Sequence, residues 1–219
     1  MNAQGKVIIK WSHKFAYALG LLVTDGSLSS DGRHIDFTSR EKEQVVTFMR
    51  CLGIVHIKIG HKTSGYAKKK QLRIQFSDVR LYKFLLAVGL MPAKTKVISK
   101  IDVPKKYFFD FLRGHFDGDG TFYSYWDKRW KHSFVFYTEF MSASEKHISW
   151  LRETIHSLIG IRGHVTRSKN SSVIQLKYGK GESLKLLQEM YYSDDVVCLK
   201  RKRYKVEEAL KTNVNARVL

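Results

Sequence analysis

Two stretches of the chain share one pattern of apolar, small and acidic positions. FAYALGLLVTDG and FDFLRGHFDGDG are both mainly apolar and both end in Asp-Gly, and a constant offset of 119 − 25 = 94 aligns them. Residues four apart lie on one stripe of a helix, so small residues there let two helices approach. We predict twin packed helices, Ser12–Asp25 and Lys105–Asp119, whose contact stripes hold Ala16, Gly20, Asp110 and Gly114.

The segments after each predicted helix also repeat. Period-two alternation predicts two strands, a helical period follows, and then two more strands and a helix. Ser39 is expected to cap the second helix, and Asp31-Gly32 is a hairpin turn signal. The further predicted strands span 54–60, 71–76, 121–126, 134–141, 161–168 and 172–178, and the further helices span 40–53, 78–90, 144–158, 181–192 and 200–211.

This order predicts an α+β fold of two pseudo-symmetric αββαββα repeats. Each repeat would hold a four-stranded antiparallel sheet with helices on one face and a polar, basic opposite face. Local echoes support a duplication, since DFTSREK matches EFMSASEK and RIQF matches VIQL. We place the first repeat at residues 1–95, a linker at 96–104 and the second repeat at 105–219.

The charge narrows the possible partners. The chain of 219 residues has 39 Lys and Arg against 20 Asp and Glu, a formal net charge of +19, which favours nucleic acid. A membrane surface fits less well because the basic residues do not gather on one amphipathic helix. No signal peptide or spanning segment is predicted. Cys51 and Cys198 stand alone, which favours an intracellular setting such as cytoplasm, nucleoid or organelle matrix.

The paired motifs resemble those of a known family. ALGLLVTDG and LRGHFDGDG are similar to the nine-residue signature of the LAGLIDADG homing endonucleases and related maturases. The second copy keeps Asp117, Asp119 and the final glycine. The first copy has Val23 where the signature has its first aspartate, and Thr24 where it has a small residue. The resemblance covers essentially the whole chain and matches the single-chain, two-motif meganucleases. It implies two sheets that form a DNA-binding saddle.

The resemblance implies a site-specific double-strand DNA endonuclease for intron homing that acts as a monomer. Such enzymes hydrolyse phosphodiesters with a divalent metal and leave staggered 3′ overhangs. The catalytic acids would be Asp25 and Asp119, and the metal residues Asp25, Asp119, Thr24 and Gly118. Two adjacent carboxylates repel unless a cation joins them, and hard cations prefer oxygen ligands. Mg²⁺ is expected, with Mn²⁺ or Ca²⁺ able to substitute for binding.

Family sites also place a lysine near each acid. Lys94 and Lys202 are the expected catalytic lysines, with Lys96 and Lys200 as open alternatives. Asp117 is expected to have a structural role, because Val23 occupies the matching position in the first motif.

Strand parity predicts a DNA-facing surface, in which side chains read base edges and basic loops hold phosphates. Strand length predicts a double-stranded target of about 18–22 base pairs. The residues of this surface are Ser27, Ser29, Arg33, Asp36, Thr38, Arg40, Lys58, Lys62, Lys68, Lys70, Arg73, Gln75, Tyr123, Tyr125, Lys128, Arg129, Lys131, His164, Thr166, Arg167, Lys169, Gln175 and Lys177.

Two other functions remain open at this point. The same fold serves intron RNA maturases, and a catalytically inactive DNA-binding protein would show the same charge and repeats. Both aspartates are retained, which favours the nuclease over the inactive binder. The aromatic residues Tyr123, Tyr125, Trp126 and Trp130 fit core packing and base stacking equally.

Overall fold

A computed structural model describes residues 5–63, 70–130, 133–167 and 171–215. Lys68, Lys131 and Lys169 of the predicted DNA-facing surface lie outside these residues. The chain forms two compact units, Met1–Gly118 and Asp119–Leu219, each of which is described by itself. In the described segments, no helix combines the length and apolar content that crossing a bilayer requires.

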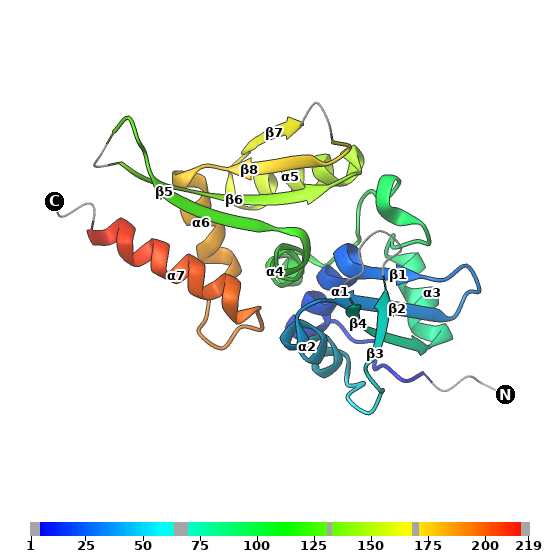
Figure 1. The fold of residues 1–219 in the computed structure, drawn as a ribbon. Coiled ribbons are helices and arrows are strands. Elements are labelled where there is room, and N and C mark those ends of the chain that lie inside the picture. Colours follow the sequence, from blue (N-terminus) through cyan, green and yellow to red (C-terminus); the bar gives the residue numbers. More distant parts are fainter. Residues whose placement is uncertain (1–4, 64–69, 131–132, 168–170, 216–219) are drawn as a thin grey trace. The chain divides into compact units, whose positions relative to one another are not determined.

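The first unit contains an antiparallel sheet with strand order β1-β2-β4-β3 (Figure 1). Ile35 and Phe37 pair with Phe76 and Ile74 on its buried face, against which the helices pack. The elements are α1 (His13–Asp25), β1 (Gly26–Leu28), β2 (His34–Ser39), α2 (Lys42–Leu52), β3 (Gly60–Thr63), β4 (Lys70–Ser77), α3 (Val79–Ala87), the 3₁₀ helices Lys94–Lys96 and Lys105–Tyr107, and α4 (Phe108–Asp119), whose last residue begins the second unit.

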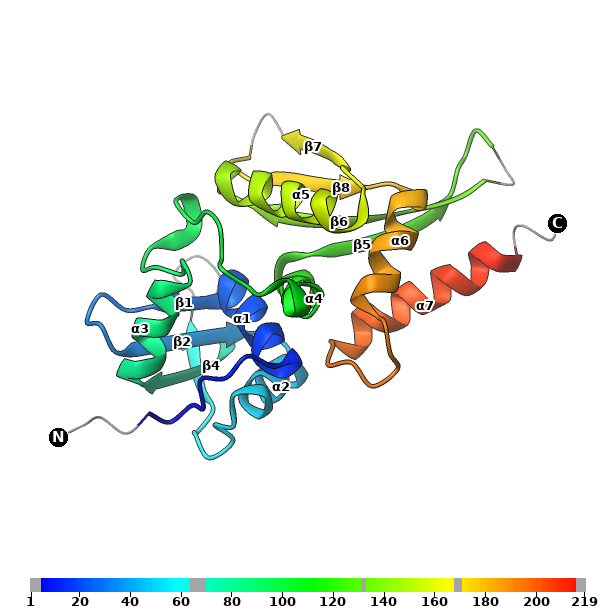
Figure 2. The ribbon, with the colours of Figure 1, turned by 180° about the vertical axis from the view of Figure 1, so that it is seen from behind.

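The second unit repeats this topology with strand order β5-β6-β8-β7. Its strands lie in front of α5 and α6 in Figure 1 and behind them in Figure 2, so these helices cover one face of the sheet. The elements are β5 (Thr121–Trp126), β6 (Phe134–Ser142), α5 (Glu145–Ile159), β7 (His164–Arg167), β8 (Ile174–Tyr178), α6 (Lys180–Met190) and α7 (Lys200–Asn215). The predicted α+β fold with two four-stranded antiparallel sheets is confirmed.

The predicted strand at 54–60 is wrong at 54–59, because Ile54 closes the end of α2 and the residues after it form a turn. Gly53 adopts a left-handed conformation with φ of 70°, and its N–H donates to the Arg50 carbonyl. The Ile54 N–H donates to the Met49 carbonyl, and the Ile54 side chain is buried. This is a Schellman motif with its usual apolar residue after the glycine. Strand β3 therefore begins only at Gly60.

The predicted cap at Ser39 is also wrong. The residue that precedes the first turn of α2 is Glu41, and it makes no side-chain capping bond. The Ser39 hydroxyl instead accepts from the Glu41 N–H and donates to the side chain of Gln44. Ser39 thus holds the side chain of Gln44 rather than the start of the helix.

Candidate functional site

The two motif helices touch through their glycines within the first unit. A Cβ atom added at Gly20 of α1 would lie 2.1 Å from the Phe111 carbonyl oxygen of α4. One added at Gly114 of α4 would lie 2.1 Å from the Tyr17 carbonyl oxygen. No side chain fits at such distances from backbone atoms. The predicted small-residue contact between these helices is therefore present in the first unit.

Asp110, which aligns with Ala16, lies in this interface as a buried charge rather than as a small contact residue. Its carboxylate is 2.6 Å from Nη2 of Arg113 on the same helix and 2.8 Å from Nδ1 of His13 on α1. Buried charges are stable only when they are paired. The helix pair is thus joined by a polar contact that the small-residue stripe did not predict.

The last turns of the two helices also meet. A Cβ atom at Gly118 would lie 1.9 Å from the Thr24 hydroxyl and 2.7 Å from Oδ2 of Asp25. The Thr24 hydroxyl donates to the Leu21 carbonyl at 3.0 Å, which holds its side chain against α1. The Asp25 carboxylate therefore lies directly beside the C-terminal turn of α4.

Lys94 reaches the end of α1. Its ammonium donates to the carbonyl of Gly26, the glycine that follows Asp25, and to the Thr24 carbonyl at 3.4 Å. Lys94 begins a 3₁₀ helix that follows Ala93 in a left-handed conformation, with φ of 51°. The other candidate, Lys96, is exposed. Lys94 is thus the lysine that contacts the helix end.

Lys202 has the matching position in the second unit. Its ammonium donates to the carbonyl of Gly120, the glycine that follows Asp119, at 2.7 Å. Lys202 is 8% exposed, whereas Lys200 at the start of α7 is exposed. Gly26 and Gly120 occupy the same place in the two motifs, so each motif glycine accepts a hydrogen bond from a lysine of its own unit.

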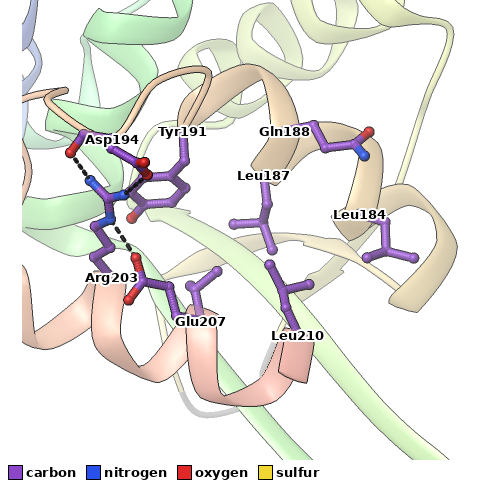
Figure 3. Close-up of a pocket in the computed structure, with 9 residues that line it drawn as sticks. Leu184, Leu187, Gln188, Tyr191, Asp194, Arg203, Glu207 and Leu210 are labelled. Carbon is purple, nitrogen blue, oxygen red and sulfur yellow. Dashed lines mark hydrogen bonds and ion pairs between the residues drawn. The ribbon is translucent and has the colours of Figure 1, made fainter. Parts of the chain in front are cut away.

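An ionic network holds the start of the helix that carries Lys202. Arg203 Nε lies 2.6 Å from Oε1 of Glu207, and Nη2 lies 2.9 Å from Oδ1 of Asp194, next to an open cavity between α6 and α7 (Figure 3). The hydrogen bond to Glu207 raises the pKa of Arg203 above its ordinary value. Arg203 thereby ties α7 to the connection after α6, next to Lys202.

The donor atoms at the motif ends are hard oxygens. The Asp25 carboxylate and the last carbonyls of α1 and α4 suit Mg²⁺ or Mn²⁺. Within the described residues, no three His, Cys, Asp or Glu side chains gather as a metal site. A metal here would therefore complete its ligand shell with carbonyl, water or phosphate oxygens, which is chemically consistent with this donor set.

The outer face of the first sheet is polar. Ser27, Asp36 and Gln75 are cross-strand neighbours on it, and Ser27 and Gln75 are exposed. Asp36 is only 8% exposed because its carboxylate pairs with Nε of Arg73 at 2.5 Å, which raises the pKa of Arg73. Lys58 lies before β3, so its assignment by strand parity is wrong. Thr38, Arg33, Arg40, Lys62 and Lys70 are exposed or half-buried.

The outer face of the second sheet is aromatic. Tyr123, Tyr125 and Tyr137 stack in pairs with ring centroids 5.3 to 6.4 Å apart. The Lys177 ammonium lies 4.1 Å from the Tyr137 ring and 3.2 Å from Oε1 of Glu139. Burial lowers the pKa of Lys177, but its bonds to Tyr123 and Glu139 outweigh this and raise it. Tyr137 and Glu139 were not predicted for this surface.

Other predicted DNA-facing residues of the second unit are accessible. Lys128 and Arg129 are exposed near the β5–β6 turn, together with Trp126 and Trp130. On β7 and β8, His164, Thr166 and Arg167 are exposed, and Gln175 is half-buried. Arg167 lies opposite the buried Ile174 of β8, and its guanidinium pairs with Glu145 of α5, so it lies on the side of the sheet that α5 covers rather than on the predicted outer face. The other residues remain available to a partner that covers the outer face.

Searches with the sequence against protein-family models and against curated proteins find no match. The fold, however, is similar to solved structures. The homing endonuclease I-WcaI bound to its DNA recognition sequence has a TM-score of 0.60 at 14% identity, over 89% of this chain and 88% of that chain. I-DmoI in complex with DNA and Mn has a TM-score of 0.52 at 15% identity, over 83% and 97%.

The N-terminal LAGLIDADG domain of DUF199/WhiA is similar as well, with a TM-score of 0.54 at 14% identity, over 86% of this chain and 87% of that chain. At these identities the likeness concerns the fold. With two four-stranded sheets of matching topology and two motif helices, the chain has the two-repeat LAGLIDADG fold of single-chain homing endonucleases.

Proposed function

We propose that the chain is a site-specific double-strand DNA endonuclease that uses a divalent metal. The observation that carries this proposal is the matching lysine at each motif end. Lys94 bonds the Gly26 carbonyl and Lys202 bonds the Gly120 carbonyl, and each follows the last strand and helix of its own repeat. A scaffold that only binds DNA has no need to bring an ammonium group to each Asp-Gly.

Asp25 and Asp119 are the proposed catalytic acids, and each serves one strand of the duplex. Together with the helix-end carbonyls of Thr24 and Gly118, they would hold Mg²⁺ or Mn²⁺. A bound divalent cation supplies charge stabilisation at the phosphate and helps to ionise the attacking water. The carboxylates hold and orient that water, while Lys94 and Lys202 place positive charge where the phosphate oxygens gain negative charge. Cutting both strands leaves the staggered 3′ overhangs.

The outer faces of the two sheets are the proposed DNA surface. The excess of 19 positive charges favours a polyanion and predicts binding that weakens steeply with salt. Arg73 and Gln75 on β4 and Gln175 on β8 can donate to base edges in the major groove. The lysines and arginines near the turns would hold phosphates. I-WcaI, of the same fold, is bound to DNA in its structure.

The two alternative functions would use the same surface. A catalytically inactive DNA-binding protein or an intron RNA maturase would keep the fold and the charge, and a LAGLIDADG domain also occurs in DUF199/WhiA. These alternatives do not require the acids and lysines at the motif ends.

Selection of cleaved sites from a random DNA library separates these functions. With Mg²⁺, the wild-type chain should enrich one target of about 18–22 base pairs. A variant with both Asp25→Asn and Asp119→Asn should enrich no cleaved sequence and should still bind the selected target in Ca²⁺. Binding of DNA without any enriched cleaved site by the wild type would refute the nuclease and leave the inactive binder.

A further inference from the structure

A buried polar network holds the residue two positions before Asp119. The Tyr17 hydroxyl of α1 donates to Oδ2 of Asp117 at 2.8 Å. The Gln44 amide of α2 donates through Nε2 to the Asp117 backbone carbonyl at 3.0 Å. The Ser39 hydroxyl donates to Oε1 of Gln44 at 2.5 Å. We call Tyr17, Ser39, Gln44 and Asp117 the Asp117 network, and all four lie in the first unit.

The network is in the interior of this unit. Asp117 is 1% exposed and Gln44 is 4% exposed. A buried amide costs free energy unless it is hydrogen-bonded, and its neighbours Val45 and Phe48 on α2 are apolar. Packing alone would be satisfied by another apolar residue at position 44. The amide adds a directional bond to a carbonyl in the last turn of α4, where the helix itself provides no partner.

These hydrogen bonds fix the position of the last turn of α4. Both the carboxylate and the carbonyl of Asp117 are held, and the next residue, Gly118, is fixed by its contact with Thr24. Asp119 follows directly in the same helix. With a rise of about 1.5 Å per residue, Asp119 lies about 3 Å along the helix axis from Asp117, so a change in the backbone at Asp117 also moves Asp119.

The Tyr17–Asp117 bond has no chemical equivalent in the other motif. At the offset of 94, Asp117 aligns with Val23 and Tyr17 aligns with Phe111, and neither Val23 nor Phe111 has a polar side chain. Gln44 is the third residue of α2, and the third residue of α5 is His147, which is also buried and keeps an N–H donor. The asymmetry between the motifs thus lies in the hydroxyl–carboxylate bond.

We propose that Tyr17 and Gln44 are positioning residues for Asp119, acting through Asp117, and that the Tyr17 bond orients only this one of the two acids. The proposal rests on the proposed nuclease function. It makes cutting of the two strands separable, because loss of the Tyr17 hydroxyl disturbs one acid and leaves the other unchanged.

The test is single-turnover cutting of the selected target in Mg²⁺, with each strand labelled separately. Tyr17→Phe should slow one strand about tenfold and change the other less than about twofold, since small misplacements of a catalytic group are costly. Asp119→Asn should reduce the cutting of this same strand more than Asp25→Asn does. Gln44→Leu should show the same bias, and Gln44→His, which keeps a donor, should restore the ratio of the two rates.

Tyr82→Phe is the matched control. Tyr82 donates its hydroxyl to the Ser29 carbonyl in the same unit, away from the helix ends, so its loss should leave the strand ratio unchanged. Equal slowing of both strands by Tyr17→Phe, or a ratio equal to that of Tyr82→Phe, would overturn the inference while the nuclease proposal stands. A wild-type chain that cuts neither strand would instead refute the proposed function itself.

Discussion

The end of α1 reads Val-Thr-Asp and the end of α4 reads Asp-Gly-Asp, yet the glycine after each accepts a hydrogen bond from a lysine. What differs is how the turn before that glycine is held. At α1 the Thr24 hydroxyl bonds back to its own helix. At α4 two other helices hold Asp117 through Tyr17 and Gln44. The shared feature supports the proposed common chemistry, and the difference supports the proposal that the two acids are positioned independently.

The two sheets differ in a parallel way. Asp36 and Glu139 lie at matching places on their second strands, and each pairs with a base from the fourth strand. Arg73 donates to Asp36 through Nε, and no second carboxylate pairs with Arg73 in the described part of the chain. The Lys177 ammonium is instead enclosed by Glu139 and two tyrosine rings. The first sheet therefore presents a donor where the second presents aromatic surface.

The largest expected effect comes from closing the space between the motif helices. Gly114→Ala places a methyl group 2.1 Å from the Tyr17 carbonyl oxygen and should cost about 3 kcal/mol or more of unfolding free energy. Gly181→Ala, where nothing lies within 4 Å, is the control and should be neutral or slightly stabilising. Urea unfolding measures both, and a Gly114→Ala protein as stable as wild type would disprove the close helix contact.

Substitution of either motif lysine should have the next largest effect, and the two substitutions should lower the cutting rate equally. Lys94→Met and Lys202→Met should each lower the cutting rate about 100-fold, because each removes a charge proposed to act at the phosphate. Lys100→Met and Lys211→Met are controls from exposed ion pairs with Asp102 and Glu208. Single-turnover cutting rates test this prediction. A large loss of rate for only one of the two lysine variants would show that the two helix ends are not equivalent.

A smaller effect should distinguish the sheets. Arg73→Ala should weaken target binding about tenfold and relax base preference in one half of the site, as expected for a base-reading arginine. Lys177→Met should change affinity less, since its ammonium is already enclosed by Glu139 and tyrosine rings. Binding measured across base-substituted targets and several salt concentrations tests this. Equal losses for both variants would contradict the contrast between the sheets.

The periodic parts of the molecule could be predicted from the sequence, whereas the contacts between distant polar residues could not. The twin helices follow from apolar residues and matched glycines at helical spacing. Residues 54–59 alternate like a strand, but Gly53 turns the chain so that Ile54 closes α2. Tyr17, Gln44 and Asp117 come from three helices, so no local pattern joins them. The available signals were Asp117, which matches Val23 in the first motif, and a glutamine among apolar positions on α2, and neither names its partner.

Strand register gives a second example. The RIQF and VIQL echo aligns Gln75 with Gln175. In the sheets, however, Gln75 lies opposite Asp36, and Lys177 lies opposite Glu139. The alignment by sequence echo thus differs by two residues from the alignment by strand register. A shift of two preserves which face each side chain occupies, so strand parity still identified the outer face.

The most direct test of the central claim compares Asp25→Asn and Asp119→Asn with wild type on the selected target. Cutting of each strand is measured in Mg²⁺ and binding is measured in Ca²⁺. Each variant should lose double-strand cutting by about 1000-fold or more and keep its affinity within about threefold, because each loses one acid and no DNA-reading residue. A single variant that still cuts both strands at the wild-type rate would contradict the account.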